Sequence, residues 1–177
     1  MTIEIRILDG SPTHAESLAK LLIEATADGT CLSFMDPLPR DKATAYWDGF
    51  LADARKGNLI MFGAFDGNRL IGTVSLCPIQ KENQPQRAEI YKLIVALSHR
   101  RKGIAAQLMQ AAEQKARELG RTLLVLDTVP NTPASAFYEK HGWTAAGTIP
   151  SYAYMPDGKI CAATYYWKKI GEVPPRI

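Results

Sequence analysis

The sequence predicts one α/β domain built around a mixed β-sheet, and three observations lead to this prediction. Strand-like and helix-like segments alternate along the 177 residues, without an internal repeat. Residues 88–126 read as strand, loop, helix and strand, a crossover unit that requires two parallel strands. Residues 58–76 carry a strong hairpin signal, which adds antiparallel strands to the same sheet.

The N-terminal part begins with a predicted strand and continues with a helix. In Thr2–Leu8, isoleucines alternate with charged residues, the pattern of a half-buried strand. Apolar residues at helical spacing then predict a helix over Ser11–Ala27, with a proline in its first turn. Residues 30–40 contain two prolines and predict a loop, which folds onto the core or lines a substrate pocket.

A second helix and the hairpin follow this loop. Asp41 is placed to cap a helix that ends at Arg55. The apolar segments Asn58–Phe65 and Arg69–Leu76 flank an Asp-Gly-Asn turn, which predicts two antiparallel strands. The polar stretch that follows, residues 79–87, predicts an exposed connection.

The crossover unit fills the centre of the chain. A strand over 88–95 leads through a short basic loop into a helix that Gly120 ends. Arg121–Leu126 is almost entirely apolar, which predicts a strand buried on both faces. A polar turn, Asp127–Thr132, should follow it.

The last elements are a short helix and two strands. The helix is predicted over Pro133–His141, opened by Asn131 or Thr132. Strands are expected at Trp143–Thr148 and Ile160–Lys168. We therefore expect a single domain over residues 1–170 and a short proline-rich tail over 171–177.

Composition narrows the classes of function. Apolar residues make up 46% and charged residues 22% of the chain, as in an ordinary globular protein. The formal charge of +3 is too small to indicate a nucleic-acid binder. Three cysteines without a C-x-x-C pair predict free thiols and no metal site. There is no signal-like N-terminus and no apolar run of membrane-spanning length, so we expect a cytoplasmic protein without a membrane partner.

The basic loop before the central helix predicts a site for a phosphate ester. Arg100, Arg101 and Lys102 supply positive charge, and the small residues Gly103 and Ala105 let backbone N–H groups approach a ligand. The helix that follows adds unpaired donors at its first turn. Neither the P-loop pattern nor the G-x-G-x-x-G dinucleotide pattern is present, which leaves the spacing Arg-x-x-Gly-x-Ala. The alternative interpretation is an exposed basic turn.

Two blocks of the sequence resemble a known family. The stretch L-I-V-A-L-S-H-R-R-K-G-I-A, which contains Arg100, Gly103 and Ala105, resembles the acetyl-CoA signature of the GNAT acetyltransferase superfamily. The stretch from Asn131 to Trp143 resembles its N-x-x-A-x-x-[FL]-Y-x-x-x-G-[FW] block. Within the superfamily, R-A-E-I-Y-K-L-I-V, L-D-T, A-F-Y and the late P-x-Y-x-x-x-P-D-G stretch look like the tabtoxin resistance acetyltransferases.

The resemblance implies a fold and a donor. The fold would have about seven mostly antiparallel strands with a central parallel pair and four main helices. The donor would be acetyl-CoA, with its pyrophosphate on the N–H groups of residues 101–106 and its pantetheine arm along the strand at Leu93 and Val95. A strand N–H at Leu93 or Ile94 would polarise the thioester carbonyl. The cofactor-binding residues implied in this way are Leu93, Ile94, Val95, Arg100, Arg101, Lys102, Gly103, Ile104, Ala105, Ala106 and Asn131.

The resemblance also implies catalytic residues. Tyr138 matches the tyrosine that protonates the departing thiolate; otherwise it is a packed aromatic. Asp127 is the first candidate for the group that binds or deprotonates the amine, and its alternative role is to cap the following turn. Glu89 is the second candidate, and its alternative is a solvent-facing strand charge. His141, at the end of a predicted helix, is expected to be structural.

The function expected from these residues is acetyl transfer to the primary amine of a small molecule. The narrower resemblance implies an amino-acid-like toxin, such as tabtoxinine-β-lactam, as the acceptor. A protein N-acetyltransferase and a non-catalytic acyl-CoA-binding module are the alternatives. Tyr138 together with Asp127 argues against the binding module, because binding alone needs no proton donor. Dimers are common in the superfamily, which makes a homodimer one expectation.

Overall fold

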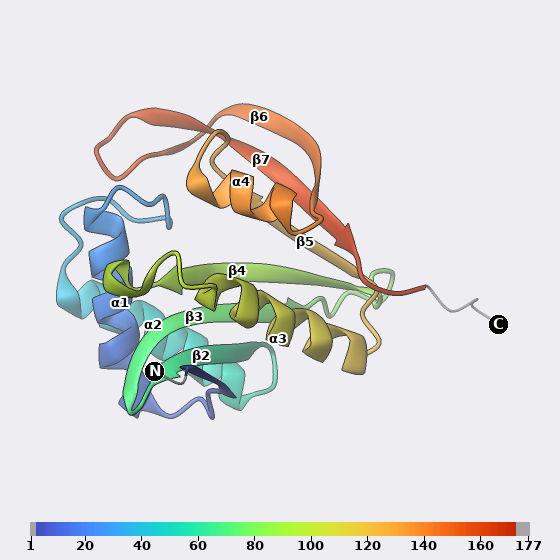
Figure 1. Cartoon of the computed structure of the whole chain (residues 1–177), viewed down its shortest axis with the longest axis horizontal. Coiled ribbons are helices and arrows are strands. Elements are labelled where there is room, and N and C mark those ends of the chain that lie inside the picture. Colours follow the sequence, from blue (N-terminus) through green and yellow to red (C-terminus); the bar gives the residue numbers. More distant parts are fainter. Residues whose placement is uncertain (1–2, 173–177) are drawn as a thin grey trace.

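A computed structural model describes residues 3–172 of the chain. They form one seven-stranded sheet in the order β1-β2-β3-β4-β5-β7-β6, with helices packed around it (Figure 1). The elements are β1 (Ile3–Ile7), α1 (Ala15–Ala27), α2 (Arg40–Arg55), β2 (Ile60–Asp66), β3 (Arg69–Pro78), β4 (Arg87–Val95), α3 (Ile104–Glu118), β5 (Leu123–Thr128), α4 (Pro133–Lys140), β6 (Thr144–Tyr154) and β7 (Ile160–Lys169).

The sheet is mixed, as the sequence predicts. The neighbours β4 and β5 run parallel, and the other neighbouring pairs of the described sheet are antiparallel. Helix α3 connects the parallel pair, which is the crossover expected from residues 88–126. The predicted fold, with seven strands, a central parallel pair and four α-helices, is confirmed.

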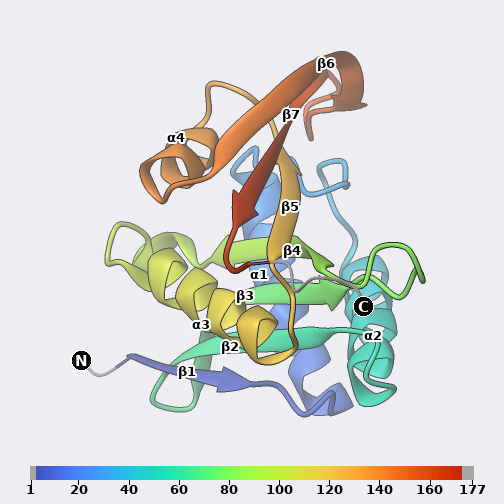
Figure 2. The same ribbon diagram turned by 90° about the vertical axis from the view of Figure 1, so that its right-hand side faces the viewer.

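The helices cover the two faces of the first four strands. Helices α1 and α2 pack against each other and against β2, β3 and β4, while α3 lies on the opposite face of the same strands (Figures 1 and 2). The largest fully buried side chain of the described core is Trp47 on α2, and Leu18, Leu22 and Leu108 are buried with it. This core packs against β4, which carries the candidate residues Glu89, Leu93, Ile94 and Val95.

Local sequence explains where the helices begin. Ser11 accepts a hydrogen bond from the N–H of Thr13 and starts a short 3₁₀ turn, Pro12–His14, which leads into α1. Thr132 and Ser135 bond each other reciprocally at the start of α4, in the form of a capping box. The predicted cap of α2 was wrong: Pro39 is its N-cap residue, and Asp41 lies inside the first turn, where its charge still favours the helix dipole.

The strand β5 differs from its prediction in position and burial. It extends over Leu123–Thr128, so Asp127 lies within the strand and not in a turn behind it. Only one face is fully buried, because Leu124 and Leu126 pack inward while Leu123 and Val125 are half-buried. An apolar run cannot show which of its faces other elements cover, and here one face meets the site.

The last hairpin is longer than the sequence predicts. Strand β6 continues to Tyr154, which places Tyr152 and Tyr154 on a strand and not on a loop. Pairing with β7 provides partners for its backbone, with irregular register around Gly147 and between Ile149 and Ala153. Pro150 is tolerated because β6 is an edge strand.

The ends of the chain add two points. The predicted division into a domain, 1–170, and a tail, 171–177, stays a prediction, because residues 173–177 lie outside the described part. Within residues 3–172, no helix combines the length and the apolar character that crossing a bilayer requires.

Candidate active site

The site begins where the two parallel strands part. The ladder between β4 and β5 consists of Arg87 with Leu123, Ala88 with Leu124, and Glu89 with Val125. Beyond this point β4 bulges: its residues 92 and 93 lie opposite one residue of β3, and Lys92 has a φ of 53°. The later backbone groups of β4 therefore face an unpaired edge toward β5, which can bind an extended ligand as an added strand would.

The basic loop places the start of α3 at the end of this unpaired edge. Gly103 is the N-cap residue with a φ of 78°, and Arg101 also has a positive φ, of 62°. Where positive-φ residues and helical residues follow one another, their backbone N–H groups point toward the same side of the loop. The first turn of α3 adds backbone N–H donors that have no acceptor within the helix. The loop therefore has the geometry of an anion site.

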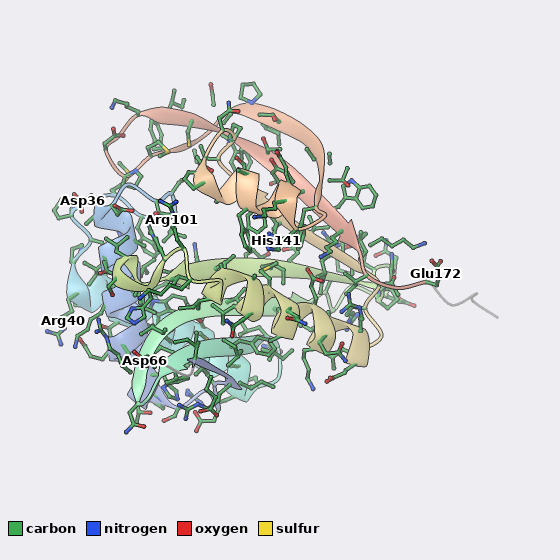
Figure 3. All side chains as sticks on the ribbon, viewed as in Figure 1. Asp36, Arg40, Asp66, Arg101, His141 and Glu172 are labelled. Carbon is green, nitrogen blue, oxygen red and sulfur yellow. The ribbon has the colours of Figure 1, made fainter. Side chains whose placement is uncertain are left out.

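The three cations of the loop have different surroundings. Arg100 pairs with Asp28 at the end of α1, at 2.6 Å, and its Nε donates to the carbonyl of Val95. Lys102 bends back to donate to the carbonyl of Ser98 at 3.1 Å. Arg101 is exposed and makes no hydrogen bond or ion pair with the described part of the chain (Figure 3). Arg101 is thus the cation that is available to an incoming phosphate.

Replacing Arg101 by alanine should raise the KM for acetyl-CoA about tenfold, because one charge-assisted contact to a phosphate is lost. Arg100→Ala is the matched comparison, since it removes the same charge from the same loop but breaks the pair with Asp28. Its KM should change by less than about threefold. Steady-state kinetics with a fixed acceptor measures both values, and a larger rise for Arg100→Ala would contradict this assignment.

Tyr138 is buried on one side of the separated strands. Its ring lies edge-on to Phe137 and Trp143 and 6.1 Å from the ring of Tyr166 on β7. Burial, with a smaller contribution from the charge of Asp127, raises the pKa of Tyr138 well above its usual value of 10. The phenol is therefore protonated over the whole working pH range.

Asp127 lies on the opposite face of the sheet. It pairs with Tyr165 of β7, so both side chains project to one face while Tyr166 and Tyr138 occupy the other. Partial burial raises the pKa of Asp127, and the positive charge of Lys92 opposes this rise. Asp127 and Tyr138 are thus held on either side of the gap between β4 and β5.

A pocket of about 330 Å³ opens beside Asp127. The loop between α1 and α2 forms one wall, and the β6–β7 hairpin forms another. The lining residues are Cys31, Ser33, Phe34, Met35, Asp127, Thr128, Val129, Tyr152, Ala153, Tyr154, Cys161, Ala162 and Ala163. Of the two roles predicted for the loop over residues 30–40, the structure shows that it lines a pocket, to which Tyr152 and Tyr154 also contribute.

Comparisons with known proteins agree with this geometry. The family model described as "Acetyltransferase (GNAT) family" matches residues 23–143, more than half of the chain. The chain belongs to the GNAT acetyltransferase family. It thus belongs to a family of acyltransferases and shares its fold.

Two curated relatives and a solved structure are similar to this GNAT chain. N-acetyltransferase 8F1 of Rattus norvegicus is 30% identical over 111 residues, 55% of this chain and 50% of the relative, so the chain spans about half the length of that protein. The uncharacterized N-acetyltransferase YsnE of Bacillus subtilis is 28% identical over 110 residues, 60% of this chain and 70% of YsnE. The structure of yncA from Salmonella typhimurium with its cofactor acetyl-CoA has a TM-score of 0.79, 16% identity, and coverage of 100% and 99% of the two chains.

The remaining predicted cofactor-binding residues lie on β4, at the start of α3 and in the turn before α4. Leu93, Ile94 and Val95 follow the bulge of β4, and Ile104, Ala105 and Ala106 form the first turn of α3. Asn131 is exposed in the turn between β5 and α4, with a φ of 58°. Ile104 is buried against the core, so only its backbone N–H is available to a ligand.

Glu89 is engaged elsewhere. Its carboxylate pairs with Arg87 at 3.0 Å and accepts a hydrogen bond from the hydroxyl of Tyr91. Glu89 is not among the residues that line the pocket. Between the two predicted base candidates, the geometry therefore favours Asp127.

Lys92 is a partly buried residue close to the pocket loop and to Asp127 that the sequence did not single out. Its ammonium donates to the carbonyl of Leu32 at 2.7 Å and to the hydroxyl of Ser33 at 3.2 Å, and it lies 5.5 Å from the ring centre of Tyr46. These contacts tie the pocket loop to the bulge of β4. A lysine in the middle of an apolar strand was the available signal, because such a charge needs a partner.

The pKa of Lys92 gives a prediction about stability. Burial lowers this pKa from 10.5 to about 8 in the folded protein, against the attraction of Asp127. Between pH 8 and 10.5 the unfolded chain holds the proton more tightly, so Lys92 should make the free energy of unfolding rise with pH by about 1–3 kcal/mol. Lys92→Met should lack this rise, and the test is urea unfolding of both proteins across the window.

Ser33→Ala is the matched control for Lys92→Met, because it weakens the loop contact but keeps the amine. It should retain the pH-dependent rise. Identical slopes for the wild type and Lys92→Met would contradict the lowered pKa.

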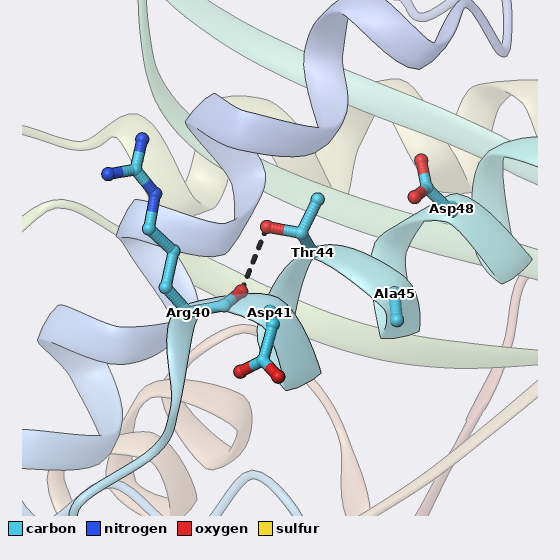
Figure 4. Close-up of a pocket in the computed structure, with 5 residues that line it drawn as sticks. All are labelled: Arg40, Asp41, Thr44, Ala45 and Asp48. Atoms are coloured by element: carbon cyan, nitrogen blue, oxygen red, sulfur yellow. Dashed lines mark hydrogen bonds between the residues drawn. The ribbon is translucent and has the colours of Figure 1, made fainter.

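Two further features lie outside this arrangement. A shallow hollow on the first turns of α2 is lined by Arg40, Asp41, Thr44, Ala45 and Asp48 (Figure 4). It consists of the surface of one helix, and Arg40 there pairs with Glu16. Among the described residues, no group of three or more His, Cys, Asp or Glu side chains is arranged to hold a metal ion.

Proposed function

We propose that this protein is an N-acetyltransferase that moves the acetyl group of acetyl-CoA to the primary amine of a small molecule, by direct attack in a ternary complex. One observation carries the proposal: β4 and β5 part beyond Glu89 and Val125, between the anion site at α3 and the pocket beside Asp127. A donor along the unpaired edge would thus reach the acceptor pocket with its thioester end.

The donor is expected to bind mainly through backbone groups. The N–H groups of residues 101–106 cradle the pyrophosphate, and Arg101 adds a charged contact. Leu93 and Val95 bond the pantetheine arm, in the manner of an added strand. An N–H at Leu93 or Ile94 polarises the thioester carbonyl, and because it belongs to the backbone, side-chain substitution cannot remove it.

The two proton transfers of the proposed reaction use two residues, which lie on opposite faces of the sheet. Asp127 binds the acceptor as a cation and accepts its proton, directly or through water, so that the neutral amine attacks the carbonyl. When the carbon–sulfur bond breaks, Tyr138 donates its proton toward the thiolate. Because burial raises the pKa of Tyr138, it is a weak acid and acts chiefly by a hydrogen bond that strengthens as charge develops on sulfur.

The setting of the reaction follows from the thiols. Cys31, Cys77 and Cys161 are free, which supports a reducing compartment such as the cytoplasm. A homodimer stays a prediction from the family resemblance.

The test is thiol release from acetyl-CoA with a panel of small amines, amino acids and peptides, with mass-spectrometric detection of the acetylated product. Turnover of small amines with formation of an N-acetyl product supports the proposal. Acetyl-CoA binding without turnover of any acceptor would instead support the non-catalytic module. Efficient turnover of peptides alone would support a protein acetyltransferase, although the walled pocket of about 330 Å³ favours a small acceptor.

Toxin resistance is a narrower form of the proposal. It rests on the resemblance of the sequence to the tabtoxin resistance acetyltransferases and predicts that an amino-acid-like toxin is acetylated. Protection of a sensitive host by the expressed protein, lost in Asp127→Asn, is the corresponding test.

A further inference from the structure

The charges around the acceptor pocket restrict what it can bind. Asp127 is the one formally charged residue among those that line the pocket. The other lining residues are aromatic, aliphatic, hydroxyl-bearing or thiol-bearing side chains. A pocket with one carboxylate and no cation suits a ligand that carries positive charge and no negative charge.

No lysine or arginine is among the residues that line the pocket, and three lysines around it make contacts of their own. Lys92 directs its ammonium to the carbonyl of Leu32 and the hydroxyl of Ser33, beneath the pocket loop. Lys159 pairs with Asp157 at 2.7 Å in the turn of the β6–β7 hairpin. Lys42 lies 5.9 Å from the ring centre of Phe34, on the side of α2. A carboxylate on the acceptor would therefore meet no cation among the residues that line the pocket.

The neutral walls suit an apolar body. Phe34 comes from the loop, and Tyr152 and Tyr154 come from β6. The hydroxyls of Tyr152 and Tyr165 lie 2.6 Å apart, which fixes the ring of Tyr152 against β7. Aromatic faces bind both hydrocarbon and organic cations, and a nearby carboxylate strengthens the second effect.

We propose that the acceptor is an amine cation with an apolar or aromatic body and without a carboxylate. The inference rests on the proposed acetyl transfer and names its substrate class. The ammonium would pair with Asp127, and the body would lie between Phe34 and the tyrosines of β6. An α-amino acid would bring its carboxylate close to Asp127 with no cation among the lining residues to pair with it, which is unfavourable in a partly desolvated pocket. This acceptor class competes with the amino-acid-like toxin that the sequence resemblance implies, because such a toxin carries a carboxylate.

The experiment compares matched acceptors that differ only in the carboxylate. Tyramine is paired with tyrosine and phenethylamine with phenylalanine, and kcat/KM is measured for each by thiol release at saturating acetyl-CoA. The kcat/KM of each amine should exceed that of its amino acid at least about tenfold. Equal values, or a preference for the amino acids, would overturn the inference. Turnover confined to carboxylate-bearing or protein acceptors would also overturn it and would leave acetyl transfer standing.

A gain-of-function variant supplies a second test. Met35 lines the pocket and is 47% exposed, so Met35→Arg adds a cation at little cost to the core. This variant should reduce the preference for tyramine over tyrosine about tenfold, while Met35→Gln should leave it unchanged. An unchanged preference in Met35→Arg contradicts the inference. Absence of turnover with every acceptor, despite acetyl-CoA binding, would instead reject the proposed function itself.

Discussion

Replacing Tyr138 by phenylalanine is expected to lower kcat about 10²–10³-fold, with little change in the KM for acetyl-CoA. The substitution keeps the ring that packs against Trp143 and Tyr166 but removes the hydroxyl that would serve the departing sulfur. Because the lost interaction forms only as the carbon–sulfur bond breaks, the effect should fall on kcat. Steady-state kinetics at saturating acetyl-CoA measures it.

Tyr166→Phe is the matched control, because it removes a hydroxyl from the same ring cluster, where that hydroxyl bonds Glu139 at 2.9 Å. Its kcat should stay within about threefold of the wild-type value. Thermal unfolding of both variants separates loss of chemistry from loss of fold. Full turnover of Tyr138→Phe would show that Tyr138 is only a packed aromatic.

Tyr138 should contribute no falling limb to the pH–rate profile. Burial raises the pKa of its phenol above the usual range, so the group stays protonated at every pH where the protein is assayed. A falling limb near pH 10 that disappears in Tyr138→Phe would contradict the buried environment.

Replacing Asp127 by asparagine is expected to lower kcat/KM about 10²-fold or more, because in the proposed mechanism the carboxylate both binds the ammonium and accepts its proton. Partial burial raises the pKa of Asp127, so the rising limb of the wild-type pH–rate profile should lie above the pH at which an ordinary aspartate ionises. The variant should lose that limb. An acceptor whose own amine has a low pKa is required, so that the limb reports the protein and not the substrate.

Glu89→Gln is the comparison for Asp127→Asn. The carboxylate of Glu89 pairs with Arg87 and does not line the pocket, so its removal should change kcat/KM by less than about threefold. If Glu89→Gln abolished the rising limb and Asp127→Asn preserved it, the roles of the two carboxylates would be reversed.

Much of the fold was predictable because its signals are local. Hydrophobic periodicity, the Asp-Gly-Asn turn and Gly120 placed the hairpin and α3 within a few residues. The errors arose where pairing partners decide the outcome. Strand β6 continues through Gly147 and Pro150 because β7 pairs with it, which no local pattern shows.

The candidate site, like the fold, was predictable from the sequence only in part. The basic loop was visible in the sequence because a phosphate site needs glycine, small residues and a helix start in a fixed order. The sequence did not show which of the three cations of the loop is free, because Arg100 pairs with Asp28, a residue 72 positions away. Lys92 escaped notice for the same reason: its partners belong to a loop about 60 positions earlier in the chain.

The sequence alone determined the crossover unit, the anion loop and the presence of Tyr138 and Asp127, because each depends on the order of neighbouring residues. Tertiary structure decided how these parts function together. The strands β4 and β5 separate beyond Glu89 and Val125, next to the bulge of β4, and the register of β5 with β7 leaves Asp127 and Tyr138 on opposite faces of the sheet. The pocket beside Asp127 is assembled from the α1–α2 loop, β5, β6 and β7. Because its lining residues are distant in sequence, only the fold could show that Asp127 is the one formally charged residue among them.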